Sequence, residues 1–105
     1  MTLNRIEMLT QFLAENPKDA FARYGLAMEY SKSGDVESAM QHFKQLLELH
    51  PDYAAGYFMA AQTLAKAGRA NEAKAFLQNG IGAAARAGNA HAKGEMEAML
   101  AELGD

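Results

Sequence analysis

A self-similarity with a period of 34 residues is the feature that most constrains how this chain of 105 residues can fold. The stretch "SKSGDVESA" at residues 31–39 has a counterpart, "AKAGRANEA", at residues 65–73. Other matched pairs are Leu13 and Leu47, Pro17 and Pro51, Ala20 and Ala54, Tyr24 and Phe58, Ala27 and Ala61, Phe43 and Leu77, and Leu47 and Ile81. A fixed period of this size indicates stacked copies of one supersecondary unit.

Helical spacing of apolar residues tells what each unit contains. From residue 36 onward they fall at i, i+3, i+4, i+7, i+10 and i+11, which is one face of a helix. Gly34 can adopt the left-handed conformation that ends a helix, and Asp35 can cap the next one. Pro51 stops that second helix, so each unit is predicted to be a helical hairpin. Four alanines would let the paired helices approach closely: Ala27, Ala39, Ala61 and Ala73.

Composition and these boundary signals give a coarse map of the chain. Only two prolines are present, and the frequent Ala, Leu, Met, Glu, Lys and Gln residues favour helix. We expect one domain over residues 1–105, with an N-terminal helix at 3–15, a first repeat at 20–51, a second at 54–88 and a capping helix at 90–103. The helices within the repeats are predicted at about 20–33, 36–49, 54–67 and 70–86.

The first unit resembles the tetratricopeptide repeat (TPR) family. Leu26 and Ala27 stand at the family's Leu-Gly positions, and Tyr30 at its tyrosine. Ala39 and Phe43 match the Ala-x₃-Phe pair, and Pro51 matches the closing proline. The resemblance spans about residues 16–88. It implies an all-α fold, an α-solenoid of about two TPR-like hairpins with a capping helix at each end.

Two departures from the family pattern affect the expected structure. Arg23 stands where the family has tryptophan or another large apolar residue, and Tyr57 supplies that residue in the second unit. Ala85 replaces the proline that should end the second unit. We therefore expect the last helix of that unit to continue to about Gly88.

Charge and composition disfavour several classes of function. The 13 acidic and 10 basic residues are scattered and give a formal net charge of −3, without the basic stripe that nucleic-acid binding needs. Without cysteine, the chain can form no disulfide, thiol nucleophile or cysteine-ligated metal site. No stretch has the length of a membrane span or the uninterrupted apolar run of a secretion signal. We expect a cytoplasmic protein that binds neither nucleic acid nor membrane.

Candidate catalytic and metal-binding groups are too sparse to form a site. His91 with Glu95, or His50 with Asp52, offers two ligands, whereas zinc needs three or four. No glycine-rich loop precedes a Gly-Lys-Ser/Thr motif, and the serines near Gly34 fit helix capping. We expect no enzyme activity, no cofactor and no metal. The acidic C-terminal helix is expected to be a solvated face, with an electrostatic docking surface as the alternative.

The resemblance implies a binding groove lined by the first helix of each hairpin. The residues expected there are Phe21, Tyr24, Met28, Phe58, Gln62 and Lys66, and Met96 and Met99 could close one end. The same aromatic and methionine spacing also fits an ordinary core. The lysine, asparagine and arginine clamp with which some family members hold chaperone C-termini is absent.

Two hypotheses of function follow. In the first, the chain is a non-enzymatic interaction module that binds a peptide or helix of a partner protein in this groove. In the second, the apolar stripe or the final helix, with Met96, Met99, Leu100 and Leu103, packs against another copy. Weak self-association therefore stays open, and the sequence does not identify the partner.

Overall fold

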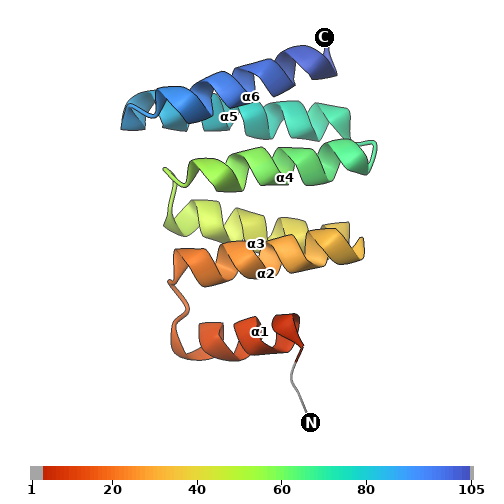
Figure 1. The fold of residues 1–105 in the computed structure, drawn as a ribbon, viewed down its shortest axis with the longest axis vertical. Helices are drawn as coiled ribbons and strands as arrows, with labels where there is room; N and C mark the ends of the chain where they lie inside the picture. The colour runs from red at the N-terminus through yellow and green to blue at the C-terminus, as the bar shows by residue number, and fades with distance from the viewer. Residues whose placement is uncertain (1–3, 105) are drawn as a thin grey trace. The chain divides into compact units, whose positions relative to one another are not determined.

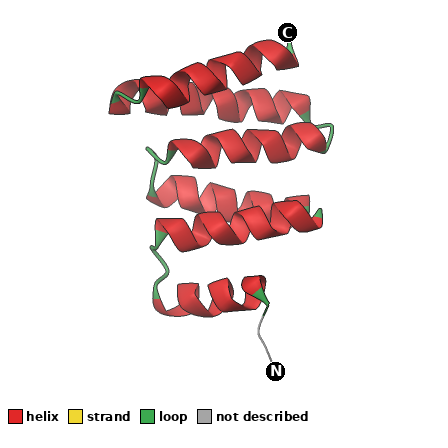
Figure 2. Ribbon diagram, in the orientation of Figure 1, coloured by secondary structure: helices red, strands yellow, loops and turns green. Residues whose placement is uncertain are grey.

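A computed structural model describes residues 4–104, and within this range the chain forms six helices and no strand (Figures 1 and 2). They are α1 (Arg5–Glu15), α2 (Ala20–Ser33), α3 (Val36–Leu49), α4 (Ala54–Lys66), α5 (Ala70–Ala87) and α6 (Ala90–Leu103). The predicted all-α class is confirmed. Most helix ends lie within one residue of the prediction, and the predicted start of the first helix, residue 3, lies outside the described residues.

The chain divides into two compact units, the first ending at His50 and the second beginning at Pro51. In the first unit α2 packs against both α1 and α3. In the second unit α5 packs against α4 and α6, and α4 also contacts α6. Each unit therefore contains one of the two predicted hairpins, α2 with α3 and α4 with α5. The assignment of residues 1–105 to a single domain stays a prediction.

Local capping explains where the helices of the first hairpin end and begin. Gly34 has φ 85°, the left-handed conformation that glycine adopts without steric cost, and it ends α2. The Asp35 carboxylate then accepts a hydrogen bond of 3.1 Å from the backbone N–H of Ser38 and caps α3. The turn predicted from "SKSGDVESA" is confirmed.

The core of the first unit is built on small residues between α2 and α3. Ala27 and Ala39 are both fully buried, so the two helices approach closely, as predicted. Phe43 and Leu46 fill the adjacent space and are also fully buried. Helix α1 is held by Leu13, which packs with Ala22 and Leu26 and with half-buried neighbours on both helices.

The second unit repeats this arrangement and adds a third helix. Ala61 and Ala73 are fully buried at the equivalent positions, and Leu77 replaces Phe43 in the core. Helix α5 continues to Ala87 and ends at Gly88, which has φ 71°. The missing proline thus has the predicted effect, and α6 lies along the lengthened helix (Figure 1).

Gly80 marks the place where the three helices of the second unit converge. A Cβ atom on Gly80 would lie 2.5 Å from the Sδ atom of Met96 on α6 and 2.6 Å from the Cβ atom of Tyr57 on α4. Both distances are shorter than van der Waals contact allows, so only glycine fits here. Met96 is 1% exposed as a result and belongs to the core.

Candidate functional site

The three predicted groove residues of the first unit differ in the solvent exposure of their side chains. The Phe21 side chain is 74% exposed, the highest value among the large apolar residues that are exposed in the described chain. Tyr24 and Met28 are half-buried. The Tyr24 ring lies edge-on to the ring of Phe43 on α3, with centroids 6.5 Å apart. Tyr24 therefore contributes to hairpin packing as well as to the surface.

Arg23, the departure from the family pattern, connects α2 to its neighbours through several hydrogen bonds. Its guanidinium donates to the carbonyl oxygen of Pro17 at 3.1 Å and to Oε1 of Gln45 at 2.6 Å. It also lies 3.2 Å from Nδ1 of His42, whose ring stacks on Tyr30 with centroids 5.6 Å apart. A long polar side chain thus occupies the position of a large apolar residue, and its terminal guanidinium group forms the hydrogen bonds.

The environment of His42 disfavours its charged form. Burial lowers the pKa of His42 below its usual 6.5, and the nearby positive charge of Arg23 lowers it further. A neutral imidazole can accept the hydrogen bond from Arg23, whereas an imidazolium cannot. This cluster fixes α2 against α3 and so holds the exposed face of α2 in position. Nothing in the amino-acid sequence signals this cluster beyond the unusual identity of residue 23.

In the second unit, two of the predicted residues line a hollow between α4 and α6. Its volume is 390 Å³, and its lining comprises Phe58, Gln62, Glu95, Ala98, Met99 and Glu102. Phe58, Gln62 and Met99 are half-buried, so both apolar and polar side chains contribute to the lining. Lys66 is exposed and does not belong to this lining. Met99 also lines the hollow, whereas the expectation that Met96 helps to close one end of the groove is wrong, because Met96 is buried in the core.

The two charged residues that line this hollow, Glu95 and Glu102, both belong to α6 and are acidic. Glu95 lies 3.3 Å from His91, which carries a positive charge only when protonated. Glu102 forms no ion pair with any residue in the range 4–104. Lys93, a permanent cation of the same helix, pairs with Glu97 at 3.6 Å, and neither residue lines the hollow. The hollow is thus lined by the half-buried Phe58, Gln62 and Met99 and by two exposed carboxylates, Glu95 and Glu102, which we call its rim.

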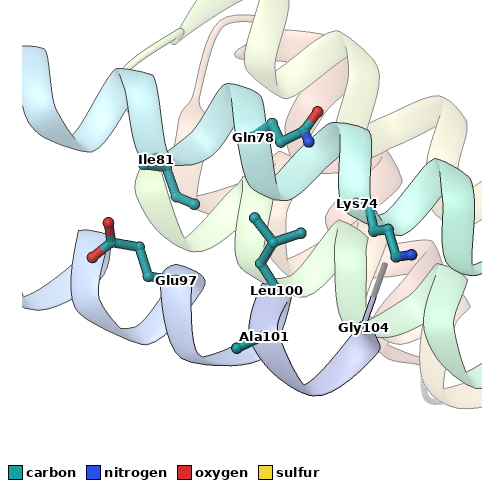
Figure 3. A pocket seen from close by; sticks show the side chains of 7 residues that line it. All are labelled: Lys74, Gln78, Ile81, Glu97, Leu100, Ala101 and Gly104. Atoms are coloured by element: carbon teal, nitrogen blue, oxygen red, sulfur yellow. The ribbon is translucent and has the colours of Figure 1, made fainter.

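A larger hollow of 540 Å³ lies between α5 and α6, and sequence reasoning did not predict it (Figure 3). Ile81 and Leu100 point into the space between the two helices, with Lys74 and Glu97 toward opposite ends. Such a hollow depends on how side chains of two helices meet. The periodicity of either helix alone does not contain this information.

The rings of His42 and His50 connect elements of the first unit. His50 Nε2 lies 2.8 Å from the carbonyl oxygen of Lys18, so its ring joins the end of α3 to the segment before α2. His91 pairs with Glu95, as the spacing suggested. Among residues 4–104 no three His, Asp, Glu or Cys side chains gather in a way that could hold a metal ion. Over the same range no helix is long and apolar enough to cross a membrane.

Paired helices repeated at 34 residues, with small residues between them and left-handed glycines at their turns, define a helical-repeat protein. Comparison with known families gives the specific assignment, because the family model described as "Tetratricopeptide repeat" matches residues 30–94. The chain therefore belongs to the tetratricopeptide repeat family. Proteins with this repeat are in general interaction modules.

Known proteins support the same assignment. A TPR repeat-containing protein of Pseudomonas aeruginosa is 33% identical over 98 residues, which cover 93% of each chain. The solution structure of a tetratricopeptide repeat domain protein from Salinibacter ruber is 27% identical, covers 84% of this chain and 89% of its own, and has a TM-score of 0.78. PcrH, solved in complex with the chaperone binding region of PopD, has a TM-score of 0.84 at 18% identity, over 93% of this chain and 74% of its own. The predicted α-solenoid fold is confirmed.

Proposed function

We propose that this protein is a non-enzymatic interaction module that binds a peptide or helix of a partner protein through the exposed faces of α2 and α4. The residues proposed to make the contact are Phe21, Tyr24, Met28, Phe58, Gln62 and Lys66. The observation that carries the proposal is the contrast between two pairs of equivalent positions. Ala27 and Ala61 are fully buried within their hairpins, whereas Tyr24 and Phe58 remain half-exposed.

The parts of these aromatic side chains that stay exposed can contribute binding energy to a partner, beyond the packing of Tyr24 on Phe43. Burying one large apolar side chain contributes roughly 1.5 to 3 kcal/mol. Association itself costs on the order of 4 to 15 kcal/mol, so a contact with a few such residues gives micromolar or weaker affinity. We therefore propose transient binding, or binding as one part of a larger assembly.

Family membership supports a protein partner, and a remote structural neighbour supports a binding role for the fold. PcrH was solved with the chaperone binding region of PopD bound to it. At 18% identity this likeness concerns the fold alone, so it does not identify a partner for this chain. The non-enzymatic role and the cytoplasmic location predicted from the sequence are parts of the same proposal.

A capture experiment with matched variants tests the proposal. The wild-type chain and a Phe21→Ala/Phe58→Ala variant are used to capture proteins from a lysate of the native organism. The control is Phe12→Ala/Leu49→Ala, because Phe12 and Leu49 are 46% and 44% exposed and lie outside the proposed surface. A partner retained by wild type and control but lost by the first variant supports the proposal. Equal capture by all three contradicts it.

Self-association through the same apolar stripe is the competing hypothesis. Burial of Met96 removes one of the four C-terminal residues proposed for that contact, which weakens the version that uses the final helix. The mass of the protein in solution distinguishes the two ideas. A stable dimer dissociated by Phe21→Ala/Phe58→Ala would favour self-association over an independent adaptor.

A further inference from the structure

We propose that the hollow between α4 and α6 binds an amphipathic helix that presents an apolar side chain between two basic residues. The apolar side chain enters beside Phe58 and Met99, and the basic side chains pair with Glu95 and Glu102. This inference rests on the proposed function and specifies the chemistry of the partner at one part of the surface.

The electrostatic argument starts from the two rim carboxylates. Glu95 has only His91 as an ion-pair partner among residues 4–104, and His91 is a cation only when protonated. Glu102 has none in that range, and Lys93 is already paired with Glu97. The charged residues that line the hollow are therefore both acidic, and Lys66 of α4 is exposed outside this lining. A partner with basic side chains at the rim is attracted, whereas one with acidic side chains is repelled.

Geometry fixes the spacing of those basic residues. Glu95 and Glu102 lie on the same helix, α6, and are seven residues apart. Seven residues make nearly two turns, so both carboxylates share one face, about 10 Å apart along the axis. A helix alongside has the same rise, and its residues i and i+7 match this distance. Its residues i+3 and i+4 lie between them on the same face and meet Phe58 and Met99.

A second copy of this chain does not fit the requirement. Its only two basic residues seven apart are Arg86 and Lys93, and the turn at Gly88 and Asn89 separates them. No helix of residues 4–104 thus offers the pattern. A net charge of −3 also opposes self-pairing at an acidic rim. The occupant inferred is a different protein.

A synthetic peptide provides the probe. It is an alanine-rich, end-blocked and fluorescently labelled peptide of about 20 residues, long enough to form a helix. It carries two lysines seven residues apart and two leucines midway between them. A second peptide has glutamine in place of both lysines, and a third has the lysines five residues apart. Fluorescence anisotropy measures the affinity of each peptide for the full chain.

Matched variants assign the binding to the hollow. We expect Glu95→Gln/Glu102→Gln to weaken binding of the first peptide about threefold to tenfold, the range expected for two exposed ion pairs, and to leave the glutamine peptide unaffected. The control is Glu15→Gln/Glu48→Gln, which changes the net charge equally at exposed residues outside the hollow and should leave both affinities unchanged. Phe58→Ala should weaken binding of both peptides at least tenfold.

Three results would overturn the inference: no binding of the first peptide, equal binding of the lysine and glutamine peptides, or equal weakening by the two double variants. Failure here and failure of the proposed function are distinguishable. If the lysate experiment still captures a partner that depends on Phe21 and Phe58, only the basic-helix inference is wrong. If neither peptide nor partner is bound, both proposals are wrong.

Discussion

Arg23 and Tyr57 occupy equivalent positions in the two repeats, and each donates a hydrogen bond to the carbonyl oxygen of the proline six residues before it. The bond from the Arg23 guanidinium to Pro17 is 3.1 Å long, and the bond from the Tyr57 hydroxyl to Pro51 is 2.8 Å long. The two side chains differ in shape and charge, yet both connect a hairpin's first helix to the preceding turn. The shared hydrogen bond explains how arginine can replace an aromatic residue here.

Removing only the Tyr57 hydroxyl tests the strength of this connection. Tyr57→Phe keeps the ring but leaves the Pro51 carbonyl without this donor, so we expect the free energy of unfolding to fall by about 0.5 to 1.5 kcal/mol. Urea unfolding measures the change. Tyr30→Phe is the control. The Tyr30 ring stacks on His42, and this contact does not use the hydroxyl group. Equal losses in both variants would contradict the assigned role.

Gly80 should tolerate no side chain, whereas Gly94 should accept one. A methyl group at position 80 would collide with Met96 and Tyr57, so we expect Gly80→Ala to cost about 1 to 3 kcal/mol of stability. Nothing lies within 4 Å of a Cβ at Gly94, which is in the middle of α6. There alanine should stabilise by about 0.5 to 1 kcal/mol through helix propensity. Thermal unfolding of both variants tests the pair, and a stable Gly80→Ala variant would contradict the convergence of the three helices.

Much of the fold could be predicted because its signals are local. The turn at Gly34, the cap at Asp35 and the extension of α5 past Ala85 each depend on a few neighbouring residues. The alanines of the hairpins were found because the 34-residue period repeats them. Gly80 was not recognised, because its role depends on Tyr57 and Met96, which approach it from two other helices.

The candidate site was less predictable for the same reason. Phe58 and Gln62 are predicted to face a groove, which stays a prediction, and in the structure they line a hollow. Its acidic rim comes from Glu95 and Glu102 on α6. The sequence predicts this helix to be a cap whose acidic face is mainly solvated. Charge and apolar surface from separate helices combine only after folding, so the pattern of one helix does not reveal the site.

Acid should weaken the first hairpin through His42. Its pKa in the folded protein lies below the usual 6.5, owing first to burial and then to Arg23. As the pH falls below about 6.5, the unfolded chain therefore takes up a proton before the folded chain does, and the free energy of unfolding decreases. The decrease ends once the pH passes the lower, folded pKa. Urea unfolding between pH 7.5 and 5 measures it, and the pH slope should be smaller in His42→Gln.

The matched variant for that experiment is His91→Gln, because His91 lies on an exposed face of α6 beside Glu95. The slope of the free energy of unfolding against pH for His91→Gln should differ from the slope for His42→Gln in this range. If replacing His42 leaves the slope of the wild type unchanged, the pH dependence originates elsewhere and the cluster with Arg23 does not control it.

The close helix approach in each hairpin predicts that larger residues at its alanines will destabilise the protein. Ala39 and Ala73 are fully buried at equivalent positions, so leucine at either one must displace neighbouring side chains or separate the helices. We expect a loss of about 1 to 3 kcal/mol in the free energy of unfolding for each variant, measured by urea unfolding. Ala75→Leu is the control, since Ala75 is exposed on α5 and leucine is well tolerated in helices. Unchanged stability in both buried variants would mean that the helices of the hairpins do not pack through these alanines.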